Sequence, residues 1–178
     1  MATERIIVNS QEITTLKELL RPGLEAVFVG LNPSNGSVKK GHYYQGRLGR
    51  RFWQRLRECN IMPALAEGAE DDDAFMHGYG FADLVRRPTG SGKELSKEEK
   101  LAAAPNLLAR LSKTGDRPAI VFVYREARKF AGPALERMGY RLLAMPAPYA
   151  TKEEVFHSMK GLRAALNRNA QVKRATDD

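Results

Sequence analysis

The sequence predicts an α/β fold, a three-layer αβα sandwich in which a mainly parallel, four-stranded sheet lies between two layers of helices. Two observations lead to this prediction: four short apolar segments alternate with helix-like segments, and 43% of the 178 residues are hydrophobic, enough to fill one core. Strands that alternate with helices join into parallel sheets that helices cover on both faces. We therefore expect one domain over residues 1–169, followed by a polar, disordered tail over residues 170–178.

The clearest of the four predicted strands is Ala26–Gly30 (AVFVG), a continuous apolar run that is typical of a strand buried on both faces. Three further apolar segments complete the sheet. They are residues 79–85 (YGFADLV), 119–124 (AIVFVY) and 141–145 (RLLAM). Sites in such sheets form in the loops at the carboxyl ends of the strands. The loops after residues 30 and 145 are therefore the first places to look for function.

Capping-box spacing, in which Ser or Thr is followed three residues later by Glu, predicts the starts of three helices. The pairs are Thr15 with Glu18, Ser96 with Glu99, and Thr151 with Glu154. The first helix is expected to be short, the second to run to about residue 111 with a break at Pro105, and the third to end at about residue 167. Residues 50–59 and 125–138 also have helical character. The acidic stretch 67–73 is expected to be a surface loop or helix start without chemistry.

Charge and composition narrow the possible functions. The 29 Lys and Arg residues outnumber the 21 Asp and Glu residues, and the net charge of +8 favours a partner that carries phosphate, although many small proteins are basic for other reasons. A single cysteine, Cys59, excludes a disulfide framework, and the three histidines lack metal-ligand spacing, so no metal or other cofactor is expected. No signal peptide or membrane span is expected. We expect a cytoplasmic monomer, associated with the nucleoid in a bacterium.

The segment Gly30-Leu31-Asn32-Pro33-Ser34 directly follows the first predicted strand. Its backbone amides and the Asn32 side chain therefore lie at the edge of the sheet where sites form. A sharp turn is the alternative explanation, since Asn, Pro and Gly all form turns.

Four motifs lie between residues 26 and 166, in the order GLNPS, GHYYQGRLGRRFW, YGFADLVRRPTGSGKELS and MPAPYAT. In their sequence, order and spacing they resemble the thymine-DNA glycosylase and mismatch-specific uracil-DNA glycosylase family, part of the uracil-DNA glycosylase superfamily. The resemblance implies a three-layer fold, a base flipped out of DNA, and hydrolysis of its N-glycosidic bond in base-excision repair. No lysine lies in the motifs as a clear Schiff-base nucleophile, so a monofunctional hydrolase is expected.

The resemblance implies that Asn32 holds the attacking water. An amide oxygen can accept a hydrogen bond from water and orient it, but it cannot take the proton as a carboxylate can, so a slow enzyme is expected. Gly30, Leu31, Pro33 and Ser34 would line the base site, with backbone amides near Leu31 and Ser34 as donors to the base oxygens.

Tyr44 aligns with the aromatic residue that stacks on the extruded base in the family. Tyr43 is the competing assignment, because this chain has one extra residue between Gly46 and Gly49. His42 could bind a phosphate or polarise the base, or could be an ordinary solvated loop residue.

Contacts to DNA are expected from basic residues near the same edge and from the last motif. The basic residues are Arg50, Arg51, Arg86, Arg87 and Lys93. The last motif contributes Pro146, Ala147, Pro148, Tyr149 and Thr151. Phe52 and Trp53 are interpreted as structural, on the apolar side of their helix.

The last motif departs from the family, because Ala147-Pro148 replaces its usual Ser-Ser or Ser-Gly pair. The position of the residue that fills the hole left by the flipped base falls near Thr151, which has a simpler role as a helix cap. Tyr149 is therefore the candidate wedge. Ser34, where the family usually has Gly, adds bulk beside the base site and leaves the range of substrates open.

The main hypothesis is a DNA glycosylase that acts on uracil or a related base in double-stranded DNA, of the G/U or G/T mismatch type. A second is a lesion-binding protein of the same fold without turnover, motivated by the altered MPAPYA loop. A third is removal of bases from single strands or free nucleosides, motivated by the missing wedge.

Overall fold

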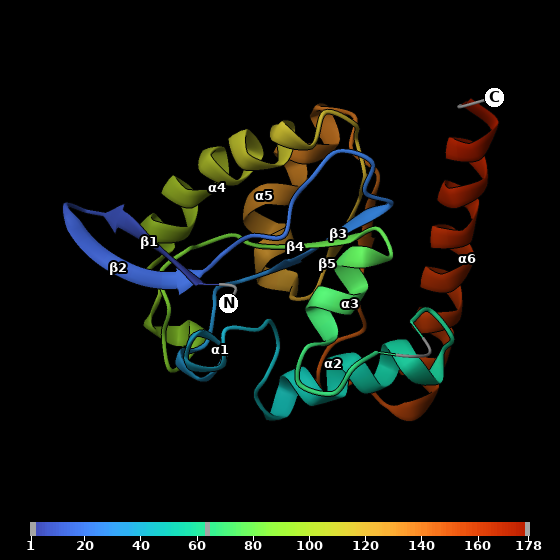
Figure 1. The fold of residues 1–178 in the computed structure, drawn as a ribbon, viewed down its shortest axis with the longest axis horizontal. Helices are drawn as coiled ribbons and strands as arrows, with labels where there is room; N and C mark the ends of the chain where they lie inside the picture. The colour runs from blue at the N-terminus through green and yellow to red at the C-terminus, as the bar shows by residue number, and fades with distance from the viewer. Residues whose placement is uncertain (1–2, 63–64, 177–178) are drawn as a thin grey trace.

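The computed structural model describes residues 3–62 and 65–176, with side chains described as far as residue 167. Four parallel strands form the central sheet in the order β4-β3-β5-β6 (Figure 1). They are β3 (Ala26–Gly30), β4 (Tyr79–Asp83), β5 (Ala119–Phe122) and β6 (Leu142–Ala144). Each lies within a predicted strand, and the predicted αβα architecture is confirmed.

The two faces of the sheet pack against different helices, because neighbouring side chains of a strand point to opposite faces. Phe28 and Val121 pack in the core formed with α2, α3 and α6, whereas Val29 and Phe122 pack in the core formed with α4 and α5. These helices are α2 (Arg47–Glu58), α3 (Glu70–Met76), α4 (Lys97–Leu111), α5 (Arg125–Arg137) and α6 (Lys152–Thr176). Figure 1 shows α4 and α5 together on one side of the sheet and α2 with α6 on the other.

The predicted helix after Thr15 is wrong, because this segment ends a strand. β1 (Thr3–Val8) and β2 (Gln11–Leu16) form an antiparallel hairpin, in which Ile6 pairs with Ile13. The Thr15 hydroxyl donates to the carbonyl of Arg86 at 2.6 Å. A capping box needs that hydroxyl to accept from a backbone amide of its own helix, so a partner 71 residues away replaces the local pattern.

Other predicted boundaries shift by small amounts. α4 is continuous through Pro105, and the Ser96 hydroxyl accepts from the Glu99 amide at its start, as predicted. The loop after β3 contains a short helix, α1 (Asn35–Lys40), and two 3-10 turns, η1 (Gly92–Glu94) and η2 (Ser112–Thr114), follow β4 and α4.

The last helix is longer than predicted. α6 continues past residue 167 to Thr176, so the structure describes the backbone of residues 170–176 as helix, where the sequence predicts a disordered tail. The extension has a simple reason, because no Gly or Pro follows Gly161 to end the helix. Residues 177–178 of the predicted tail lie outside the described residues. Among the described helices, none combines the length and the apolar character needed to cross a membrane.

Candidate active site

The candidate site begins where β3 and β4 end side by side. Gly30 pairs with Asp83 at the carboxyl ends of the two strands. A Cβ atom on Gly30 would collide with the Asp83 carboxylate and would come within 3.1 Å of the Tyr44 hydroxyl. Only glycine therefore allows the strand, the carboxylate and the tyrosine to meet here.

Asn32, two residues further on, is half-buried and has a defined orientation. Its Nδ2 donates to the Thr89 hydroxyl at 2.7 Å and to the Arg87 carbonyl at 3.0 Å. The Thr89 hydroxyl donates its own proton to the Ser91 carbonyl at 2.9 Å, so it can only accept from Asn32. The Pro33 carbonyl also accepts from Nδ2, at 3.3 Å. These three oxygens can pair only with the nitrogen of the amide, which leaves Oδ1 on the other side to accept a hydrogen bond from water.

The loop that holds Asn32 is fixed to the loop after β4. The Thr89 amide donates to the Pro33 carbonyl at 3.1 Å, and the Asn35 amide donates to the Thr89 carbonyl at 3.2 Å. Ser34 caps α1, because its hydroxyl accepts from the Ser37 amide at 3.1 Å. Two loops more than 50 residues apart in the sequence therefore behave as one unit around Asn32.

The two candidate stacking residues differ in their burial. Tyr43 is 2% exposed and packs against Phe81 in the core, so it cannot stack on a bound base without unfolding this region. Tyr44 is half-buried, with its ring 4.3 Å from that of Phe52, and its backbone φ of 56° is unusual for a residue with a side chain. Such a backbone persists only where the surroundings enforce it, and it is typical of functional sites. Of the two candidates, the structure favours Tyr44.

The inner end of Tyr44 reaches a buried acidic group. Its hydroxyl is buried without a hydrogen-bond partner in the described structure, close to Gly30 and Asp83. Burial raises the pKa of the Asp83 carboxyl to about 8, and repulsion from Glu18 adds to the effect against the opposing charges of Arg86 and Arg110. At neutral pH the Asp83 carboxyl is therefore mostly protonated.

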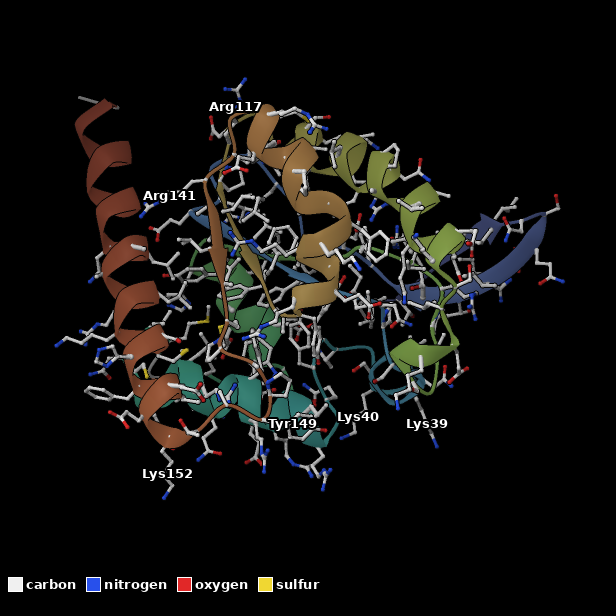
Figure 2. The ribbon with its side chains drawn as sticks, turned by 180° about the vertical axis from the view of Figure 1, so that it is seen from behind. Lys39, Lys40, Arg117, Arg141, Tyr149 and Lys152 are labelled. Carbon is white, nitrogen blue, oxygen red and sulfur yellow. The ribbon has the colours of Figure 1, made fainter. Side chains whose placement is uncertain are left out.

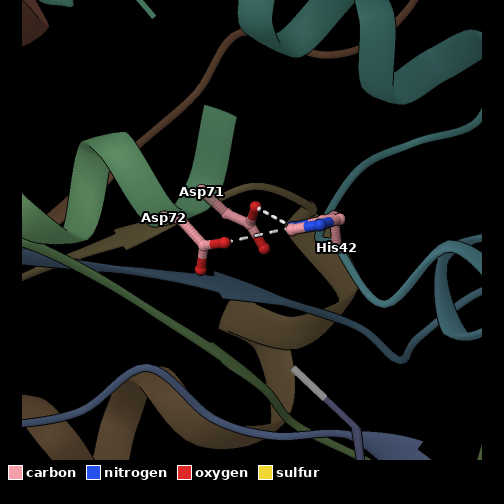
Figure 3. Close-up of side chains that lie close together, drawn as sticks. All are labelled: His42, Asp71 and Asp72. Atoms are coloured by element: carbon pink, nitrogen blue, oxygen red, sulfur yellow. Dashed lines mark hydrogen bonds and ion pairs between the residues drawn. The ribbon is translucent and has the colours of Figure 1, made fainter. Parts of the chain in front are cut away.

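His42 is held by the acidic stretch, to which the sequence assigned no chemistry. Its Nδ1 lies 2.8 Å from Asp71 Oδ1 and 3.6 Å from Asp72 Oδ2 (Figure 3). The second Asp71 oxygen accepts from the Tyr43 amide at 2.8 Å. Burial raises the pKa of Asp71, and the hydrogen bonds from Tyr43 and His42 oppose this. The three side chains offer ligand atoms within 4.8 Å of one another, and in this structure His42 Nδ1 and Asp71 Oδ1 are joined by a direct hydrogen bond. The stretch therefore anchors the loop that carries Tyr44.

The predicted DNA-binding cations fall into two groups. Arg50, Arg51 and Lys93 are exposed and free to contact phosphate. Arg86 is instead a structural residue, since it bonds Glu4 at 2.7 Å and the Leu16 carbonyl at 2.9 Å. Arg87 is largely neutralised, because Glu99 accepts from two of its nitrogens at 2.7 and 2.9 Å. Both side chains are thus engaged in ion pairs within the protein, and the phosphate contacts predicted for Arg86 and Arg87 stay predictions.

The backbone of the loop after β6 is held by hydrogen bonds, whereas the side chain of its tyrosine, Tyr149, is exposed. Arg55 of α2 donates to the carbonyls of Pro146, Ala147 and Pro148 at 3.1, 3.2 and 3.3 Å. Tyr149, which follows them, is 79% exposed. Its side chain points outward at the end of the molecule where Lys152 begins α6 (Figure 2).

Thr151 caps α6 as predicted. Its hydroxyl accepts from the Glu154 amide at 3.3 Å, and its own amide donates to the Glu154 carboxylate at 2.7 Å. This reciprocal pair occupies the Thr151 side chain and leaves Tyr149 as the candidate wedge.

The structure does not bring all the predicted residues into one groove. Tyr149 lines a groove between α2 and α6 whose lining includes neither Asn32 nor Tyr44. The Leu31 side chain is 8% exposed and packs in the core beside α4 and α5, so Leu31 can reach a base only through its backbone, and the predicted role of the backbone amide stays a prediction.

Sequence reasoning missed two residues of this site. Thr89 fixes Asn32 and lies in the loop RRPTGSGK, of which the sequence analysis considers only the basic residues. Asp83 ends the segment YGFADLV, where a charge in an apolar strand was the signal that could have indicated a functional group.

Comparison with known proteins decides the family. The model of the uracil DNA glycosylase superfamily matches residues 18–171, which include both strands of the site and its loops. The chain belongs to the uracil DNA glycosylase superfamily. In this member of the superfamily the Asn32 loop follows β3 directly, where the motifs predicted it.

The chain is also similar to one further protein in sequence and to one solved structure in fold. It is 40% identical over 76 residues to a G/U mismatch-specific uracil DNA glycosylase from Schizosaccharomyces pombe, a match that covers 42% of this chain and 23% of that one. It thus spans about a quarter of the length of that relative. A solution structure from Methanosarcina acetivorans, provisionally assigned as a uracil DNA glycosylase, has a TM-score of 0.59 at 21% identity and covers 86% of this chain and 97% of its own. That likeness concerns the fold.

Proposed function

We propose that this glycosylase is a monofunctional hydrolase that removes uracil or a related base from mismatched sites in double-stranded DNA and leaves an abasic site. The observation that carries the proposal is the fixed Asn32 amide, whose nitrogen is bound by Thr89 and Arg87 and whose oxygen is left for water. The partial similarity to the G/U mismatch-specific enzyme of S. pombe supports the type of mismatch.

The proposed chemistry is cleavage of the bond between C1′ of the sugar and the base nitrogen. Positive charge develops on the sugar and negative charge on the leaving base. Asn32 Oδ1 would accept a hydrogen bond from a water and direct its oxygen at C1′. The network around Thr89 sets this geometry before DNA binds. Orienting the water therefore adds little to the activation free energy of bond cleavage. An amide cannot take the proton of the attacking water, so this proton passes to bulk solvent, and slow turnover is expected.

The base would be held at the carboxyl ends of β3 and β4. In this proposal the Tyr44 ring stacks on the extruded base, and the exposed Tyr149 fills the space that the base leaves in the duplex. Arg50, Arg51 and Lys93 would bind phosphates, so binding would weaken as salt is raised.

The test is a panel of duplexes with G·U, G·T, ethenocytosine or hypoxanthine, with the released free base identified by mass. Release of uracil from G·U, with an alkali-labile strand as the other product, is the expected result. Salt-sensitive binding of all duplexes without release of any base would instead support the alternative of a lesion-binding protein, which the altered loop Ala147-Pro148 motivates.

A further inference from the structure

The exposed aromatic side chains of the protein are concentrated in one place. Of its fourteen Phe, Tyr and Trp residues, only Tyr149 (79%) and Phe156 (64%) are exposed. Both line the same groove of about 1050 Å³, which lies between α2, α6 and the loop after β6. Because exposing an aromatic ring to water is unfavourable, two such rings in one groove indicate a partner that covers them.

The groove is also strongly basic. Five cationic side chains and one acidic side chain, Glu58, line it. Arg55 is engaged with the backbone of residues 146–148, but Arg51, Lys152, Lys160 and Arg163 are exposed. The acidic residue is partly engaged as well, since Gln54 donates to Glu58 at 2.7 Å. The groove therefore attracts anions.

The rings and cations of α6 share one face of the helix. Lys152, Phe156, Lys160 and Arg163 are spaced four, four and three residues apart, which places them in one row along the helix. At 1.5 Å per residue the row extends over about 16 Å. Figure 2 shows Lys152 at the start of this row, at the same end of the molecule as Tyr149. A row of alternating cations and an aromatic ring is complementary to a chain of phosphates and bases.

We propose that the groove between α2 and α6 binds single-stranded DNA, with bases stacked on Tyr149 and Phe156 and phosphates bound by Arg51, Lys160 and Arg163. A duplex hides the faces of its bases inside the stack, so it could use the cations but not Phe156. Single strands expose these faces, and stacking on an aromatic side chain stabilises each base by about 1–3 kcal/mol. The choice of DNA over other polyanions rests on the proposed function, whereas the preference for a single strand rests on the groove alone.

The test compares Phe156→Ala with Leu101→Ala, a matched control on α4 whose side chain is 52% exposed and lies outside the groove. Binding of fluorescent oligo-dT of twelve nucleotides, and of the duplex of the same length, is measured by anisotropy on the full chain. Phe156→Ala is expected to weaken binding of oligo-dT about tenfold, which corresponds to about 1.4 kcal/mol of lost stacking. Leu101→Ala should bind oligo-dT like the parent protein, and Phe156→Ala should change duplex binding less than twofold.

A second variant tests the charges of the same row. Lys160→Glu with Arg163→Glu is expected to weaken oligo-dT binding further and to reduce its dependence on salt, since about 0.7 counterions are released per phosphate contact with a single strand. Unchanged binding of oligo-dT by Phe156→Ala, or an equal loss for the duplex, would overturn the proposal. These binding results do not depend on excision, so a failed excision assay would refute the proposed chemistry and leave the groove to be judged on its own data.

Discussion

Asp83→Asn is expected to remove a large part of the dependence of stability on pH. Asp83 is 2% exposed at the end of β4, and the groups that act on it are Glu18, Arg86 and Arg110 together with the hydroxyl of Tyr44 nearby. Burial raises its pKa from 3.8 to about 8 in the folded protein. Asparagine has nearly the same shape as the protonated carboxyl group but carries no charge at any pH.

The sign of the effect follows from proton binding. Between pH 4 and pH 8 the folded protein keeps a proton on Asp83 that the unfolded chain has released, so the free energy of unfolding falls as the pH rises. The stabilisation is fully present below the unfolded pKa and is lost as the pH rises through the folded pKa. Each pH unit inside this window costs about 1.4 kcal/mol, so the contribution of Asp83 between pH 5 and pH 7 is about 2.7 kcal/mol, or about 100-fold in the unfolding equilibrium.

The assay is urea unfolding at pH 5, 6 and 7 for the parent protein, Asp83→Asn and the control Glu12→Gln, whose side chain is 63% exposed. The parent protein and Glu12→Gln should lose stability with rising pH in parallel, and Asp83→Asn should lose about 2.7 kcal/mol less over this range. The same loss in Asp83→Asn as in the parent protein would show that the carboxyl group ionises normally, and the reasoning would fail.

Three further changes test the site. Thr89→Val removes the hydroxyl that accepts from Asn32 at 2.7 Å, and single-turnover excision is expected to become slower by about tenfold or more. Urea unfolding should show a loss of only about 1–2 kcal/mol in the free energy of unfolding. An excision rate equal to that of the parent protein would show that the hydroxyl does not position the amide. Tyr44→Phe removes a buried hydroxyl without a partner and should leave the free energy of unfolding unchanged or raise it by up to about 1 kcal/mol, whereas a clear loss would reveal a hydrogen bond not present in this conformation. Gly30→Ala forces Asp83 away from β3 and should lower stability by more than about 2 kcal/mol in the same unfolding assay, and a neutral result would contradict the close approach of the two strands.

The sheet could be predicted because its signals are local. β3 agrees with the predicted Ala26–Gly30 at both ends, since five apolar or small residues lie between a turn and a loop rich in turn formers. The position of Asn32 follows, because the residue after a buried parallel strand must lie at the functional edge of the sheet.

The features that the sequence could not predict depend on distant partners. Thr15 has the spacing of a helix cap, but pairing with β1 and the hydrogen bond to Arg86 decide its structure. Arg86 was predicted to bind DNA, yet its partner Glu4 lies 82 residues away.

The buried acidic residues Glu70 and Asp71 were expected at the surface. Although burial acts to raise its pKa, hydrogen bonds from Gln45 and Arg57 lower the pKa of Glu70 overall. Charged side chains that the local sequence pattern places at the surface are thus buried where segments far apart in the chain supply their partners.

The central claim is that the Asn32 amide oxygen orients the attacking water. Its most direct test is the single-turnover rate of uracil release from a G·U duplex by Asn32→Ala, with Asn35→Ala as a matched control on the exposed first turn of α1. The account predicts a loss of about 100-fold or more for Asn32→Ala with unchanged duplex binding, and a rate close to that of the parent protein for Asn35→Ala. An undiminished rate in the Asn32→Ala protein would contradict it.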